Sequence, residues 1–262
     1  ADFDAGELFR LVTGQDARLA DRPLTAEQAA KLEALTARRA TREPLQYLCG
    51  SWPFLDFELA VGPGVLCPRA DTEVVAEAAA QMLAGVQAPK VLDLCAGTGC
   101  LGLGVKRFCP EADVTCVEKS PEAFRYLKKN AVSALKQGTA QAVEGDLFHY
   151  WQGLPEGELD LIVSNPPYIP TADIEALDPS VRDHEPHLAL DGGADGLDFY
   201  RVIADKWRDA LLPNGLMAFE VGIGQADEVL RIMRTNGFGD IQIVKDLHGI
   251  PRVVYGRLCK EI

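Results

Sequence analysis

Short apolar runs separated by helical patterns constrain the fold of this chain more than any other feature of its sequence. One such run ends at Gly145. The others lie at 91–94, 114–117, 159–163, 216–221, 241–244 and 251–256. Strands that alternate with helices form a parallel sheet covered on both faces. The last two runs have no helical pattern between them and are expected to pair antiparallel, so the sequence predicts an α/β fold with seven strands.

The N-terminal part of the chain predicts a separate helical unit and a linker. Residues 25–28 form a capping box, and apolar side chains then recur at helical spacing. Residues 53–68 alternate apolar and polar side chains and turn at 62–64, which predicts a β-hairpin. A helix capped by Asp71 or Thr72 should follow. The expected units are a helical domain at 1–52, a hairpin linker at 53–70 and an α/β domain at 71–262.

A glycine-rich turn after the first strand of the α/β domain marks a candidate cofactor site. In residues 91–99 a strand leads into this turn and a helix follows, so backbone N–H groups can face a ligand. The spacing Gly97-x-Gly99-x-x-Gly102, with Glu118 about twenty residues later, also fits a dinucleotide fingerprint. On this pattern alone a nicotinamide-dependent dehydrogenase remains open.

Asp93, at the end of the same strand, distinguishes a nicotinamide dinucleotide from S-adenosylmethionine (SAM) as the cofactor. Its carboxylate would repel a pyrophosphate but attract the ammonium and sulfonium groups of SAM. SAM is therefore the expected cofactor, with Glu118 placed to hold ribose hydroxyls. Asp146 follows another strand to the same sheet edge and can accept a hydrogen bond from the adenine amino group. Leu147 and Phe148 either contact the adenine ring or belong to the core.

The segment Asn165-Pro166-Pro167-Tyr168 follows an apolar strand and carries the most specific chemistry. A proline holds the residue before it in extended conformations and donates no N–H, so this loop fixes where its carbonyl groups point. Such a loop suits a planar amide nitrogen, whose lone pair is delocalised and must be localised before it can attack a methyl group.

Two acceptors on the loop can do this. The Asn165 side-chain oxygen and the Pro166 carbonyl can accept both N–H bonds of a primary amide, which leaves the nitrogen lone pair facing the methyl donor. Tyr168 can stack on the amide plane. We therefore expect Asn165, Pro166 and Tyr168 to be catalytic and Pro167 to complete the substrate-binding loop.

Several segments together resemble the peptide chain release factor N5-glutamine methyltransferase family (HemK/PrmC), and the likeness covers nearly the whole chain. The matching segments are 42–50, 65–73, the loop around Asp93, 165–169 and 191–197. The tetrapeptide Asn-Pro-Pro-Tyr alone is shared with adenine-N6 DNA methyltransferases. The helical unit and Arg69-x-Asp-Thr-Glu73 are similar to the glutamine enzymes specifically.

This resemblance implies a Rossmann-like class I SAM-dependent methyltransferase that acts on the Gly-Gly-Gln glutamine of release factors. The side-chain nitrogen, N5, would receive the methyl group, S-adenosylhomocysteine would be the other product, and no metal would be needed. The helical domain would dock the release factor. By motif match, the residues that contact SAM are Cys95, Ala96, Gly97, Thr98, Gly99, Glu118, Leu147 and Asn165.

The chain departs from the family pattern at three places. Cys95 and Ala96 replace the usual Gly-Thr start of the loop, Glu118 is commonly Asp, and Leu147 stands where an aromatic residue is often found. These changes bear on cofactor affinity more than on the type of reaction.

His184 and His187 resemble a metal-binding pair, but Pro186 between them keeps them off a shared helix face. A role in capping the loop is the better interpretation. The seven cysteines form no CxxC pair, and we expect them to be reduced thiols rather than disulfides or zinc ligands.

Charge and hydropathy limit the partners. The formal net charge of −13 disfavours binding to phosphate backbones, so no direct nucleic-acid partner is expected. An adenine-N6 methyltransferase is the second hypothesis, although no basic groove or recognition domain is visible. A non-catalytic SAM-binding or translation-factor-binding module would not need Asn165 and Tyr168. With no membrane-length apolar run and no signal-peptide pattern, we expect a cytoplasmic monomer without membrane contact.

Overall fold

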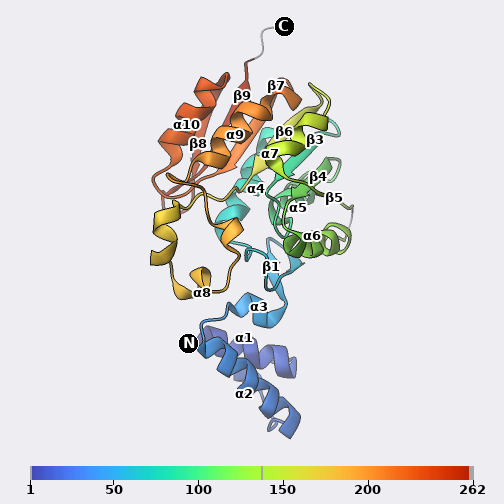
Figure 1. Cartoon of the computed structure of the whole chain (residues 1–262). Helices are drawn as coiled ribbons and strands as arrows, with labels where there is room; N and C mark the ends of the chain where they lie inside the picture. The colour runs from blue at the N-terminus through green and yellow to red at the C-terminus, as the bar shows by residue number, and fades with distance from the viewer. Residues whose placement is uncertain (1, 137, 260–262) are drawn as a thin grey trace.

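A computed structural model describes residues 2–136 and 138–259, so the outer ends of the predicted domains, at 1 and 262, lie outside the described residues. Figure 1 shows a helical module at the N-terminal end, a small hairpin, and a body in which helices cover both faces of a sheet. The module consists of α1 (Asp2–Thr13), α2 (Ala26–Ala40), α3 (Leu45–Cys49) and the 3-10 turn η1 (Ala17–Leu19). The predicted capping box is present, because Thr25 and Gln28 each bond the other's backbone N–H through their side chains.

The hairpin consists of β1 (Ser51–Phe54) and β2 (Phe57–Ala60), which pair antiparallel. Its turn is at Leu55 and Asp56, where Leu55 has a φ of 53°. The turn predicted at 62–64 lies after the second strand instead. Phe54 and Phe57 face each other and pack in one buried cluster, and the Glu73 side chain accepts from Leu55 N–H at 2.8 Å. These contacts place the reversal earlier than glycine and proline alone suggested.

Seven strands form the main sheet in the order β5-β4-β3-β6-β7-β9-β8, as predicted in number. Their bounds are β3 (Lys90–Leu94), β4 (Asp113–Glu118), β5 (Gln141–Glu144), β6 (Leu159–Ser164), β7 (Leu211–Glu220), β8 (Phe238–Lys245) and β9 (Pro251–Leu258). The first five are parallel, and β9 runs antiparallel to both β7 and β8. The expected antiparallel closing pair is confirmed.

Each central strand is apolar on both faces because helices cover both sides. Leu92 and Ile162 belong to a cluster on the side of α9 (Asp198–Lys206) and α10 (Ala226–Thr235). Val91 and Leu161 belong to another cluster on the side of α4, α5 and α6. The bounds of these helices are α4 (Ala70–Met82), α5 (Cys100–Phe108) and α6 (Pro121–Ser133). None of the helices in the described ranges is long and apolar enough to cross a membrane.

The start of α4 differs from the prediction that Asp71 or Thr72 caps it. The helix begins at Ala70, and its N-cap, Arg69, makes no side-chain capping bond. Asp71 instead pairs with Arg252 at 3.0 Å, and the Thr72 hydroxyl donates to the Glu220 carboxylate at 2.6 Å. Partners distant in sequence therefore take the side chains that local rules assign to the cap.

The chain between β6 and α9 extends from the sheet toward the helical module (Figure 1). It contains η3 (Thr171–Ala176), α8 (Pro179–Arg182) and η4 (His187–Ala189), while α7 (Leu147–Tyr150) and η2 (Trp151–Gly153) follow β5 and η5 (Arg208–Ala210) follows α9. A β-bridge between Ile169 and Asp191 joins the two ends of the extension. At its far end, His184 Nε2 lies 3.1 Å from the carbonyl oxygen of Thr41.

Asn130 on α6 ties the hairpin to the glycine turn. Its side-chain nitrogen donates to the carbonyls of Ala60 at 3.0 Å and Thr98 at 2.9 Å, and its oxygen accepts from Ala60 N–H at 2.8 Å. The residue is only 2% exposed, so water cannot replace these bonds. We expect Asn130→Ala to lower the free energy of unfolding by about 2 to 4 kcal/mol, since it leaves buried backbone groups unpaired.

Urea denaturation of the purified variant measures this loss. Asn236→Ala is the matched control, because that partly buried side chain makes one bond, to the Ile232 carbonyl at 2.8 Å. The control should lose less than about 1 kcal/mol. Equal losses in the two variants would contradict the role assigned to Asn130.

Candidate active site

One cavity lies at the carboxyl ends of the central strands. At this point of the sheet β3 has β4 on one side and β6 on the other. This is where ligands bind in open α/β sheets. The empty space of the cavity is about 1020 Å³ when the open solvent at its mouth is included. The predicted residues that line it are Asp93, Cys95, Ala96, Gly97, Thr98, Glu118, Asp146, Leu147, Phe148, Asn165 and Pro167. Gly99, Pro166 and Tyr168 do not line it.

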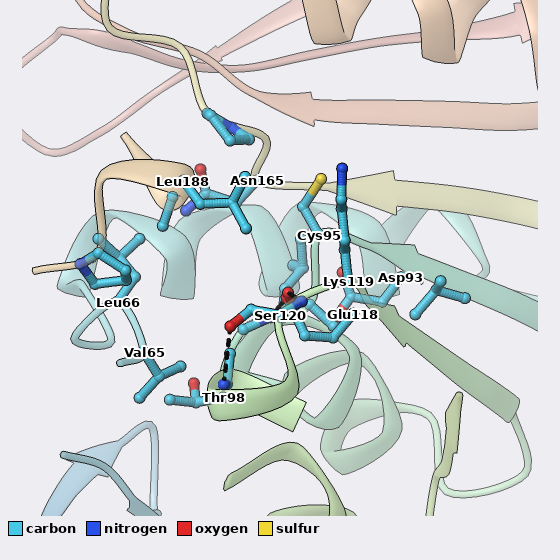
Figure 2. Close-up of a pocket in the computed structure, with 18 of the residues that line it drawn as sticks. Val65, Leu66, Asp93, Cys95, Thr98, Glu118, Lys119, Ser120, Asn165 and Leu188 are labelled. Carbon is cyan, nitrogen blue, oxygen red and sulfur yellow. Dashed lines mark hydrogen bonds between the residues drawn. The ribbon is translucent and has the colours of Figure 1, made fainter. Parts of the chain in front are cut away.

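Two segments to which sequence reasoning assigned no site residue contribute to the wall, at 64–69 and at Pro186, Leu188 and Ala189. Thr72 also lines the cavity. In Figure 2 Asn165 and Leu188 approach from the upper side of the view, whereas Glu118 and Ser120 lie below them. The cavity is therefore bounded by parts of the chain that are far apart in sequence.

The glycine turn needs unusual backbone geometry. Gly97 and Gly99 have φ values of 56° and 83°, and a Cβ on Gly99 would lie 2.7 Å from the Leu127 side chain. Cys95 also has a positive φ, 60°, although it carries a side chain. A non-glycine residue in this region costs roughly 1 to 2 kcal/mol. Cys95, which replaces the family's usual glycine, therefore strains the backbone of the turn locally.

Asp93 holds the start of α5 through a buried hydrogen bond. Its Oδ2 accepts from Gly102 N–H at 2.8 Å, and the residue is 1% exposed. Burial raises the pKa of Asp93 to about 7, against the lowering effect of the Gly102 N–H, and the nearby Glu118 raises it further. A charge at this position is therefore costly unless a cation lies beside it.

Glu118 braces the other side of the turn. One carboxylate oxygen accepts from Gly97 N–H at 2.8 Å and the other from Ser120 N–H at 2.7 Å. Burial raises the pKa of this carboxyl, while both N–H groups lower it. The two acids thus hold the backbone of the glycine turn and also present negative charge to the cavity.

The chain after β5 supplies a mixed polar and apolar wall. Asp146 caps α7 by accepting from Phe148 N–H at 3.0 Å, and it pairs with Lys119 at 3.0 Å. Leu147 is 6% exposed and belongs to the core, where its carbonyl accepts from the Trp207 indole at 3.1 Å. Phe148 is 37% exposed at the cavity. Of the two side chains, Phe148 is the better exposed to contact a ring.

Asn165 directly follows β6 and reaches the cavity with one end of its side chain anchored. Its Nδ2 donates to Thr72 Oγ1 at 3.3 Å. The next residue, Pro166, is buried. Tyr168 is held through its carbonyl, which accepts from Gln225 Nε2 at 2.8 Å, and burial raises the pKa of its phenol to about 12. Stacking of this ring on a substrate amide stays a prediction.

The structure adds an ion pair at the cavity wall that sequence patterns did not single out. Arg69 and Glu185 lie 2.6 Å apart, and the Glu185 side chain is almost completely buried. Glu185 also accepts from Cys67 N–H at 3.4 Å. This carboxylate therefore joins the 64–69 wall to the 186–189 wall. In the sequence, the proline that follows Glu185 predicts a loop but gives no sign of this ion pair.

Comparison with known proteins identifies the family of the chain. Residues 59–192 match the methyltransferase small domain, and residues 2–50 match the PrmC N-terminal domain. A release factor glutamine methyltransferase of Geobacter sulfurreducens is 46% identical over 239 residues, covering 91% of this chain and 81% of the relative. One of Rhodospirillum rubrum is 41% identical, covering 97% and 76%.

The chain belongs to the release factor glutamine methyltransferase family. Solved structures with the same fold include a precorrin-6y C5,15-methyltransferase of Geobacter metallireducens, at 11% identity and a TM-score of 0.51, covering 76% of this chain and 94% of that one. A SAM-dependent methyltransferase of Agrobacterium tumefaciens has 17% identity, a TM-score of 0.51, and coverage of 81% and 71%. The seven-stranded sheet of this family member is thus a methyltransferase fold.

The buried charge of Asp93 makes a prediction about stability. Burial raises the pKa of Asp93 from 3.8 to about 7, so the unfolded chain loses this proton near pH 4 and the folded chain only near pH 7. The cost of ionising the buried carboxyl therefore grows between these two pH values and is complete above about pH 7. Asp93→Asn should therefore increase the free energy of unfolding by roughly 1 to 3 kcal/mol at pH 8. The gain should shrink at lower pH and vanish near pH 4.

Urea denaturation at pH 8 and pH 5 measures the difference. The exposed Asp113→Asn on β4 is the control and should stay within about 0.5 kcal/mol of the wild type at both pH values. An Asp93→Asn variant that is less stable than the wild type at pH 8 would show that the carboxylate is a net stabiliser.

Proposed function

We propose that this chain transfers a methyl group from SAM to the side-chain amide nitrogen of the glutamine in the Gly-Gly-Gln motif of peptide chain release factors. The observation that carries the proposal is Asn165, which is anchored through its nitrogen and lines the cavity. Its oxygen is the atom left to accept a hydrogen bond from a substrate N–H. The names of the relatives with high identity support the same substrate.

The cavity suits SAM in the chemistry of its lining. Asp93 and Glu118 supply carboxylates for a cationic ligand with hydroxyl groups, and Phe148 supplies apolar surface beside the acceptor Asp146. When bound, SAM supplies an electrophilic methyl group on a positively charged sulfur. The other expected contacts are Cys95, Ala96, Gly97, Thr98, Gly99, Leu147 and Asn165.

The chain's own residues prepare the amide. The Asn165 side-chain oxygen and the Pro166 carbonyl accept the two N–H bonds of the glutamine amide, which concentrates electron density on its nitrogen. Pro167 keeps the loop in its extended shape, and Tyr168 packs on the plane of the amide. The nitrogen gains the methyl group and releases one N–H proton to water. Positioning of this kind would accelerate the transfer without a strong general base.

The helical domain, residues 1–52, is proposed to receive the release factor, and the β-hairpin linker, 53–70, joins it to the catalytic domain. The supporting observation is that the extension between β6 and α9 touches this module through His184 and Thr41, and also lines the cavity through Leu188. A protein docked on the module would therefore lie beside the cavity formed by the 71–262 domain.

Methyl-labelled SAM tests the substrate. The purified chain is incubated with a bacterial release factor in one reaction and with single-stranded or duplex DNA in another, and mass spectrometry locates the label. We expect methyl on the glutamine of the Gly-Gly-Gln motif and none on DNA. Label on adenine alone would overturn the proposal in favour of an adenine-N6 methyltransferase, and bound SAM with no label would favour a non-catalytic module.

Asn165→Ala should lower the rate of glutamine methylation by at least roughly 100-fold, because one of the two acceptors is lost. SAM affinity, measured by titration calorimetry, should change less than about threefold, since the acceptor acts on the amide more than on the cofactor. Asn236→Ala, distant from the cavity, serves as the control. Loss of SAM binding or of the fold in Asn165→Ala would contradict the assignment.

A further inference from the structure

We propose that Thr72 and Glu220 are positioning residues that set which end of the Asn165 amide faces the substrate, an inference that rests on the proposed function. Neither residue lies in the Asn-Pro-Pro-Tyr loop. Together with Asn165 they form a short chain of hydrogen bonds from the cavity wall into the protein interior.

The sheet register brings the two ends of this chain together. Ser164 on β6 pairs with Phe219 on β7, so the next residues, Asn165 and Glu220, emerge side by side at the carboxyl edge. Thr72, in the first turn of α4, links them. Its Oγ1 accepts from Asn165 Nδ2 at 3.3 Å and donates to Glu220 Oε2 at 2.6 Å.

Burial gives this chain a single direction. Thr72 is 1% exposed and Glu220 is 2% exposed, so these two have little access to bulk water. A threonine hydroxyl has one proton, and an ionised carboxylate can only accept. Thr72 must therefore donate to Glu220 and accept from Asn165. The Asn165 nitrogen is then turned inward, and its oxygen is left for the N–H groups of the substrate amide.

The reverse direction would disable the acceptor. A protonated or amide side chain at position 220 can donate to Thr72, whose own proton would then point at the Asn165 oxygen. The Asn165 NH₂ group would face the cavity and meet the N–H groups of the glutamine, donor against donor. The buried negative charge of Glu220 thus fixes which way the Asn165 amide is turned.

The surroundings of Glu220 make this charge conditional on pH. Burial raises the pKa of Glu220 to about 7, while the Thr72 hydroxyl bond lowers it. The charged and titratable groups near Glu220 on the packed elements are Arg69, Asp71, Cys100, Tyr168, Tyr200 and Arg252. Arg252 lies within 3.0 Å of both Asp71 and Asp246, so it is shared with other carboxylates.

Three threonine variants separate positioning from packing. Thr72→Val removes the hydroxyl and keeps the volume, Thr72→Ser restores the hydroxyl, and Thr115→Val on β4 is the control outside the cavity. Each is assayed with labelled SAM and a bacterial release factor for kcat and KM, and by calorimetry for SAM affinity. We expect Thr72→Val to lower kcat at least about tenfold, with KM and SAM affinity within about twofold, and Thr72→Ser to recover most of the loss.

Three results would overturn the proposal. They are a Thr72→Val kcat close to that of the wild type, an equal loss in Thr72→Ser, and a parallel loss of SAM affinity. A wild-type chain that fails to label the release factor would instead overturn the proposed function, and this inference with it. Because the wild type and the variants are assayed side by side, the two failures are distinguishable.

The pH profile supplies a readout that packing alone would not change. At saturating SAM, wild-type kcat should fall as pH drops through about 7, because Glu220 takes up a proton and the direction of the hydrogen bonds is lost. Thr72→Val has no such chain to reverse, so its smaller kcat should lack this acid limb. An identical limb in Thr72→Val and Thr115→Val would contradict the assignment.

Discussion

Carboxylates that accept backbone N–H groups at the ends of β3 and β4 hold the glycine turn, and the cavity depends on them. Asp93 fixes the start of α5 through Gly102, and Glu118 fixes the turn itself through Gly97. Each acid is mostly buried, so these bonds offset part of the cost of removing a charge from water. The same two side chains keep negative charge next to the space where a cationic cofactor would bind. Structural support and ligand attraction thus use the same atoms.

In the loop after β6, the orientation of hydrogen-bond acceptors matters more than the net charge that faces the cavity. The loop after β6 carries acceptors, and its prolines contribute no donors. An amide substrate brings two N–H groups, so acceptors that are held in place before binding suit it better than flexible ones. The Asn165 amide can present either a donor or an acceptor to the cavity, and its neighbours in the interior decide between them.

The sequence predicted the parts of this arrangement that follow from local rules. The antiparallel closing pair, the glycine turn and the loop at Asn165 all arise from residues close together in the chain. The hydrogen bond from Thr72 to Glu220 joins residues 148 positions apart, and no periodicity indicates it. For the same reason the predicted cap of α4 was wrong, because long-range partners took the side chains. Pro166 and Tyr168 do not line the cavity, because the loop after β6 turns them away from the wall that Asn165 and Pro167 form.

The extension between β6 and α9 contacts both halves of the molecule. His184 rests on the helical module, Glu185 grips Arg69, and Leu188 borders the cavity, all within five consecutive residues. A shift of the module relative to the sheet would travel along this stretch and alter the cavity wall. If a protein substrate docks on the module, as proposed, its binding would reach the cavity wall through the same stretch. A free glutamine or a short peptide would contact the cavity but not the module. This coupling would therefore favour an intact protein substrate over its fragments.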